Sequence, residues 1–248
     1  MLEHTFTTPL PLTLEVAIPS GDIEVETVDG DQTHLTVDGD DELLELVEIH
    51  QDGNRVTVTM RSKSKMGFFG SIMWGKDSLR VQASVPHGAD VKVKTASADS
   101  EIKGRVGRLD VNSASGDLVL RGEADDVIVK TVSGDVDVAR VGGNLSVQSV
   151  SGDVRSGAVS GSVDTKSVSG DIRLEGVSAG DVRFASVSGD IEIGVASGSL
   201  LDVDAGSTSG DLSSEIPISS APAGDGGGSP TVVLRGRTVS GDVRVFRA

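Results

Sequence analysis

The chain has 248 residues, among them 32 glycines, no cysteine, no tyrosine and only 2% aromatic residues, and its formal net charge is −16. This length is enough for one large domain or two small ones. The absence of cysteine excludes disulfides, thiolate catalysis and cysteine-ligated zinc, and the negative charge argues against nucleic acid as a partner, because nucleic-acid binding relies on lysine and arginine.

Residues 1–90 are predicted to form strands that cap one end of a larger β-structure. Apolar residues alternate with polar ones in three stretches, 12–18, 56–60 and 79–85, which is typical of half-buried strands. Residues 41–50 fit a short helix and a strand about equally well. The first 50 residues contain 13 acidic side chains and no lysine or arginine. We interpret this stretch as a solvated acidic surface, with a docking surface for a basic partner as the alternative.

A basic and aromatic segment, residues 61–76, separates two of these strands and holds half of the aromatic side chains of the chain. We predict a long loop that folds over an open end of the structure, because a bare sheet edge invites aggregation. The alternatives are a contact for a protein partner or for self-association and, further, peripheral membrane contact, for which phenylalanine and tryptophan beside lysine are suited. The candidate contact residues are Lys63, Lys65, Phe68, Phe69, Met73, Trp74 and Lys76.

The main signal lies in an internal repeat of the tripeptide Ser-Gly-Asp. From the degenerate copy at Ser97 onward, four successive spacings are 18 residues. Each unit consists of two nine-residue halves, in which glycine and a polar residue precede a short apolar-x-apolar strand. Such halves cannot bury their apolar side alone, but stacked coils can. The sequence therefore predicts an all-β, single-chain β-solenoid over residues 91–248, with about 18 residues per coil.

The repeat aligns its aspartates in one column, for which we predict a structural role as turn caps. A calcium site is the alternative, since stacked carboxylates provide oxygen ligands. The opposite edge carries mixed side chains that form no ligand set, and we predict no metal and no cofactor. The column consists of Asp117, Asp135, Asp153, Asp171, Asp190, Asp211 and Asp242.

Two features stand near the end of the chain. Residues 214–230 are rich in glycine, serine and proline, and we predict a flexible surface insertion between two successive coils. After it, Val243–Phe246 is expected to form the final strand of the solenoid. There Arg244 and Arg247 would act as charged residues that discourage end-to-end stacking.

The Ser-Gly-Asp-[Val/Ile]-x-[Val/Leu] units and the strand ending in Val85-Pro86-His87-Gly88 resemble a bacterial β-strand-repeat family of unknown function, the "putative adhesin" family related to Toastrack domains. The resemblance covers nearly the whole chain. It implies a link to envelope-stress signalling beside membrane or transcriptional-regulator partners, and it implies no catalytic residues.

These observations predict a non-enzymatic scaffold or interaction module with an unidentified protein partner. The four histidines share no metal-ligand spacing, and no nucleophile elbow or phosphate-binding loop is present. The alternatives are a self-assembling, filament-forming protein and a cell-surface adhesin. Because the first residues lack an export signal and no apolar run could span a bilayer, we expect a cytoplasmic protein.

Overall fold

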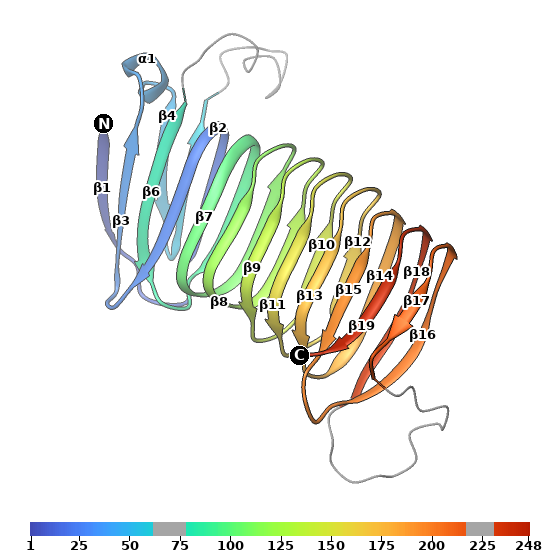
Figure 1. Cartoon of the computed structure of the whole chain (residues 1–248). Helices are drawn as coiled ribbons and strands as arrows, with labels where there is room; N and C mark the ends of the chain where they lie inside the picture. The colour runs from blue at the N-terminus through green and yellow to red at the C-terminus, as the bar shows by residue number, and fades with distance from the viewer. Residues whose placement is uncertain (62–77, 217–230) are drawn as a thin grey trace. The chain divides into compact units, whose positions relative to one another are not determined.

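The computed structural model describes residues 1–61, 78–216 and 231–248, and the prediction of an all-β solenoid is confirmed (Figure 1). The chain forms two compact units, Met1–Ala124 and Asp125–Ala248. Strands of the first unit are β1 (Leu2–Thr7), β2 (Thr13–Val28), β3 (Gln32–Asp38), β4 (Val47–Asp52), β5 (Arg55–Met60), β6 (Leu79–Pro86) and β7 (Asp90–Ser113), and β8 (Leu118–Lys130) crosses from the first unit into the second. The remaining strands are β9 (Val136–Val141), β10 (Leu145–Gln148), β11 (Val154–Val159), β12 (Val163–Lys166), β13 (Ile172–Val177), β14 (Gly180–Ser188), β15 (Ile191–Val195), β16 (Leu200–Ser209), β17 (Leu212–Ser214), β18 (Thr231–Ser240) and β19 (Val243–Arg247).

The first unit combines parallel and antiparallel pairing. The long strand β2 pairs in parallel with β7 on one side, and with β5 and β6 on the other. Beyond these strands the pairing becomes antiparallel, between β1 and β3, β3 and β6, and β4 and β5. The segment that fitted a helix or a strand contains both, since the short helix α1 (Asp41–Leu44) directly precedes β4.

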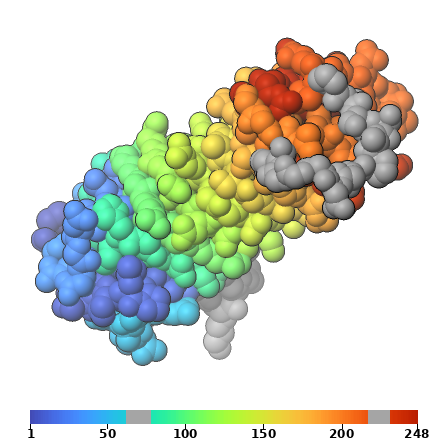
Figure 2. Space-filling view, turned by 90° about the horizontal axis from the view of Figure 1, so that it is seen from below, coloured from blue at the N-terminus to red at the C-terminus, as the bar shows by residue number. Residues whose placement is uncertain are grey.

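The second unit is built from coils in parallel register. One face contains β10, β12 and β14 with the end of β8, and the other contains β9, β11, β13 and β15. Val154 pairs with Val136 on one side and with Ile172 on the other, a shift of one repeat in each direction. In Figure 2 these coils form successive bands from green through yellow to orange.

The last coil of the chain does not lie at the end of the stack. β18 pairs with β14 on one side and with β16 on the other, and β19 lies in the same way between β15 and β17. The expectation that Val243–Phe246 forms the terminal strand is therefore wrong. Within the described residues, the outermost coil is the earlier one, β16 with β17.

The same pairing changes the interpretation of the long spacing before the last repeat. The coil that follows residues 214–230 fills the position before the coil that precedes them, so this segment joins two neighbouring coils whose stacking order is the reverse of their order in the sequence. Ser214 is the last residue of β17 and pairs with Val245. Residues 217–230 lie outside the described residues.

The core consists of stacked columns of aliphatic side chains, and each coil contributes one residue to a column. Along one face, Val136, Val154, Ile172, Ile191 and Val243 occupy the same register position, and each has at most 2% of its surface exposed. β-Branched side chains suit this interior because they favour extended backbone and stack at the strand spacing. Such a core leaves little room for aromatic residues.

Candidate interaction surfaces

The aspartate column lies at one corner of the coils and accepts backbone hydrogen bonds. The N–H of Asp153 donates to Oδ1 of Asp135 at 2.9 Å, and the N–H of Asp171 donates to Oδ1 of Asp153 at 3.0 Å. The same bond joins the next members of the column, through Asp190 and Asp242 to Asp211, and in the first unit it joins Asp117 to Asp99. Each carboxylate thus holds the turn of the next coil, which is the geometry of a cap.

A second polar column at the opposite corner has the same function with mixed side chains. The N–H of Asn144 donates to Oδ1 of Asp126, the N–H of Ser162 to Oδ1 of Asn144, and the N–H of Asp181 to Oγ of Ser162. From the sequence, these residues were predicted only to form no ligand set. The nine-residue half-repeat, which places a polar residue after each turn glycine, was the signal for this second ladder.

Hydroxyl residues two positions before each motif serine point into the corner. Ser167, Ser186 and Thr238 are buried, and each donates a hydrogen bond to the carbonyl oxygen two residues later. The next residue must therefore face outward. In five coils that residue is a valine about half exposed to solvent, and the sequence shows the signal as a valine directly before five of the eight Ser-Gly-Asp copies. The residues are Val132, Val150, Val168, Val187 and Val239.

The acidic first part of the chain is partly neutralised within its own unit. Glu15 contacts Lys94 at 2.8 Å and Arg55 at 3.4 Å, and Glu24 contacts Lys103 at 2.6 Å. The hydrogen bond from Lys94 holds the pKa of Glu15 below its ordinary value, and that from Lys103 does the same for Glu24. The negative charge of β2 is therefore partly neutralised by lysine and arginine side chains from strands that come later in the sequence.

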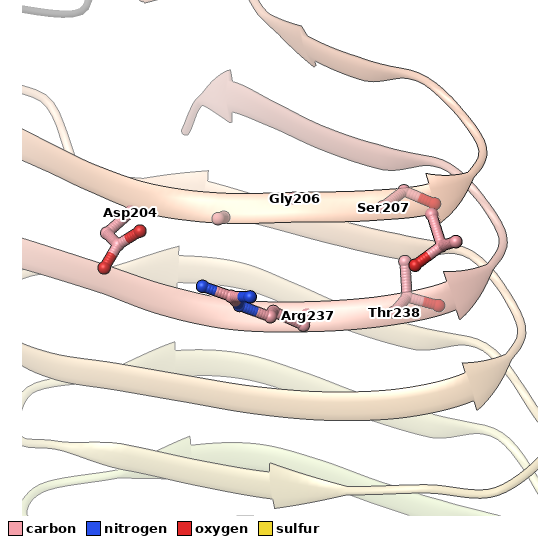
Figure 3. A pocket seen from close by; sticks show the side chains of 7 residues that line it. Asp204, Gly206, Ser207, Arg237 and Thr238 are labelled. Carbon is pink, nitrogen blue, oxygen red and sulfur yellow. The ribbon is translucent and has the colours of Figure 1, made fainter.

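An open groove with mainly apolar walls lies between β1 and the segment of α1 and β4 in the first unit. This groove is lined by Leu2, His4, Leu44, Val47, Glu48, Ile49 and His50. A second surface depression in the described part of the chain lies on β16 and β18, where Arg237 stands next to Gly206 (Figure 3). There the hydroxyls of Ser207 and Thr238 are already bonded to the backbone.

The predicted contact residues Lys63, Lys65, Phe68, Phe69, Met73, Trp74 and Lys76 lie outside the described residues. The histidines are dispersed: His34 hydrogen-bonds Thr5, His87 hydrogen-bonds Thr27, and His4 stacks on Phe6. The described part of the chain contains no group of three or more histidine, aspartate or glutamate side chains placed to hold a metal ion. None of its helices is long and apolar enough to cross a membrane.

Comparisons with known proteins agree with this architecture. None of the curated proteins matches the chain. A putative adhesin from Bacteroides fragilis NCTC 9343 is similar in structure, with a TM-score of 0.54 at 14% identity over 98% of this chain and 96% of that one. A putative lipid binding protein from Parabacteroides distasonis ATCC 8503 reaches a TM-score of 0.47 at 14% identity, over 98% and 96% of the two chains. The first of these likenesses shows the fold alone.

The family model Toastrack DUF4097 matches residues 12–246. The matched range includes the parallel strands of both units and both polar ladders, so the resemblance seen in the Ser-Gly-Asp repeats extends over most of the sequence. The chain belongs to the Toastrack DUF4097 family.

Proposed function

We propose that this protein is a non-enzymatic scaffold that acts by presenting its surface to a protein partner. The observation that carries the proposal is the use of the repeated polar side chains. The aspartates and the opposite polar column bind backbone N–H groups of the next coil, and the corner hydroxyls bind carbonyl oxygens. Side chains held in this way are positioned to support coils, and the outward residues of the strands are left for contact.

The proposal extends to the setting and the contact site of the protein. The resemblance to Toastrack proteins supports a place in bacterial envelope-stress signalling, and a cytoplasmic location is part of the proposal. The basic and aromatic segment is the sequence's strongest candidate for the contact itself, because it concentrates phenylalanine and tryptophan, which are enriched at interfaces.

The test is a crosslinking and affinity experiment in a bacterial host, with the whole chain as bait. We compare the wild type with a variant in which residues 62–77 are replaced by a short glycine-serine linker, and with a matched control in which residues 217–230 are replaced. We expect a partner that is recovered with the wild type and the control and lost with the first variant. Equal recovery with all three baits would refute the assignment of the contact, and a turnover activity of the purified chain would refute the scaffold.

End-to-end self-assembly is a second candidate, supported by the outermost coil. Leu212 occupies the register position of Val243, yet it is 42% exposed whereas Val243 is 0% exposed. Within the described residues, β16 and β17 each pair with a strand on one side only. Filaments seen by electron microscopy with the wild type and lost with Leu212→Glu would favour this candidate, and their absence at high concentration would remove it.

A further inference from the structure

An apolar ridge runs along one corner of the second unit. Backbone pairing between the motif serines places these residues on adjacent coils. At about 4.8 Å per coil the ridge is about 19 Å long. It consists of Val132, Val150, Val168, Val187 and Val239, which are 46–52% exposed, and we call it the valine ridge.

The fold does not require valine at these positions. In the outermost coil the equivalent residue is Thr208, which is exposed and lies between Ser207 and Ser209, the register partners of Thr238 and Ser240. Threonine has nearly the shape and β-propensity of valine, and its hydroxyl is compatible with water. Outward positions on the adjoining face are charged, such as Arg155, Arg173 and Arg244. A solvent-exposed row of aliphatic side chains in a surface that is otherwise polar marks a contact site.

Opposite charges flank the valine ridge on its two sides. In three of its five coils, an exposed base stands two residues before the valine, at or near the end of β8, β12 and β18. In every coil an aspartate stands three residues after the valine, at the start of the other face. The bases are Lys130, Lys166 and Arg237, and the aspartates of the same coils are Asp135, Asp171 and Asp242.

We propose that a second copy of this chain packs on the valine ridge and forms a parallel, coil-matched dimer. A twofold axis parallel to the stacking direction places the basic side of each ridge opposite the acidic side of the other. A twofold axis perpendicular to that direction, with the ridges antiparallel, places base against base and acid against acid. Closed dimers of identical chains use such self-complementary patches, and charge complementarity selects the parallel arrangement. A second copy also has the same coil spacing, so every valine meets a valine.

The length of the ridge determines the strength of the contact. A stable dimer buries about 800 Å² on each partner, and a ridge about 19 Å long is too small for that. The dimer is therefore weak and concentration-dependent. This inference goes beyond the proposed scaffold, which needs no self-association, so each can fail without the other.

Disulfide capture tests the arrangement, because the wild-type chain contains no cysteine. In the parallel dimer, Val150 faces Val150 of the partner subunit, and Val187 likewise faces its own equivalent. In an antiparallel dimer centred on Val168, the two positions face each other instead. We therefore expect Val150→Cys and Val187→Cys each to form a disulfide-linked dimer alone under mild oxidation. Ala139→Cys, exposed on β9, is the control for random collision.

Two results would overturn the proposal. The first is dimer formation by the ridge variants no faster than by Ala139→Cys. The second is capture only in a mixture of Val150→Cys and Val187→Cys, which identifies the antiparallel arrangement. Unchanged circular dichroism of each variant verifies the fold, and cysteine is close enough in size to valine for the coils to tolerate it.

Sedimentation velocity of the unmodified protein over a concentration series tests the charges. We expect Lys130→Glu with Arg237→Glu to raise the dissociation constant about tenfold or more, because like charges then face each other across the ridge. Arg140→Glu, an exposed site on β9, should leave the dissociation constant unchanged. Leu212→Glu should also leave it unchanged, and this variant distinguishes a dimer at the valine ridge from end-to-end assembly. A wild type that stays monomeric at its highest soluble concentration, or equal effects of the ridge and control variants, would refute the dimer.

Discussion

Adjoining coils approach each other closely at the motif glycines, and this approach can be tested at Gly170. This residue has a φ of +122°, and a Cβ added to it would lie 2.3 Å from the carbonyl oxygen of Gly152 in the adjoining coil. Gly30 has the same φ of +122°, but an added Cβ would meet nothing within 4 Å. The two sites therefore share a φ that L-residues rarely adopt and differ in their neighbour, so the pair of alanine variants separates the two effects.

The magnitudes follow from this difference. Forcing alanine into a backbone region that L-residues rarely adopt costs of order 1–3 kcal/mol, and this cost applies to Gly30→Ala and Gly170→Ala alike. Gly170→Ala additionally pushes a methyl group into a backbone atom that cannot move without shifting a coil, an overpacking cost of about 1–3 kcal/mol. We expect Gly170→Ala to lose about 2 kcal/mol more than Gly30→Ala, which corresponds to roughly 10 °C in Tm for a unit of about 120 residues.

Urea unfolding followed by circular dichroism provides the free energy of unfolding of each variant. We expect hydrogen exchange to show the loss of stability in the first unit for Gly30→Ala and in the second unit for Gly170→Ala. Gly198→Ala is a control within the second unit, because Gly198 has a φ of +89° and no atom near its added Cβ. If all three variants lost the same free energy, the close approach of the coils would not be the reason for glycine in the motif.

Three further predictions follow from the ladders, the ion pairs and the coil order. Asp171→Ala should lower the free energy of unfolding by about 1 kcal/mol, because the N–H of Asp190 loses its acceptor, whereas Asp171→Asn, which keeps Oδ1, should lose less; equal losses in urea unfolding would contradict the cap. The pKa of Glu15 is held below its usual 4.5 by the hydrogen bond from Lys94. The contribution of ionised Glu15 to the free energy of unfolding is therefore complete above pH 4.5 and is lost as the pH falls through the lowered pKa. The free energy of unfolding should therefore fall less steeply with decreasing pH in Glu15→Gln than in the wild type, and identical pH dependence in the two proteins would refute this. Gly236→Ala should lower the free energy of unfolding more than Gly206→Ala, because an added Cβ on Gly236 would lie 2.5 Å from the carbonyl oxygen of Phe184 on β14 whereas one on Gly206 would meet nothing within 4 Å, and equal losses would contradict the interleaved order.

Much of the second unit could be predicted because the repeat carries both its period and its chemistry. Four equal spacings imply that equivalent residues stack, and the pairing of Val154 with Val136 and Ile172 follows directly. The aspartate ladder was predictable for the same reason, since an Asx side chain after a turn glycine has a backbone N–H within reach in the next coil. The repeat contains no such information for residues 1–90, where the antiparallel pairing of β1, β3 and β4 depends on long-range contacts.

The order of the last coils could not be predicted from the repeat. Parallel coils offer one another the same backbone hydrogen bonds, so a coil accepts any other coil of the same register as its neighbour. The spacing of 31 residues fits both a loop between successive coils and a return to an inner position. The choice must therefore come from side chains, which the period alone does not describe.

The side chains of β14 and β15 supply that choice. Phe184 lies against Gly236, where an added Cβ would be 2.6 Å from the ring, and Phe246 lies 3.0 Å from the place of a Cβ on Gly194. Both aromatic rings of the described second unit thus rest on a glycine of the adjoining coil, and the buried Phe184 would face Ala205 instead if the coils stacked in chain order.

Charges select the same neighbour. Glu192 lies between Arg173 and Arg244 and contacts both, whereas in chain order it would face Ser213, the register partner of Arg244. The guanidinium of Arg173 also lies 5.9 Å from the ring centre of Phe246. A large side chain over a glycine and a carboxylate between two arginines stabilise only the interleaved arrangement. The backbone thus makes the coils interchangeable, and the few outsized or charged side chains determine which coil is inserted and which is left at the open end.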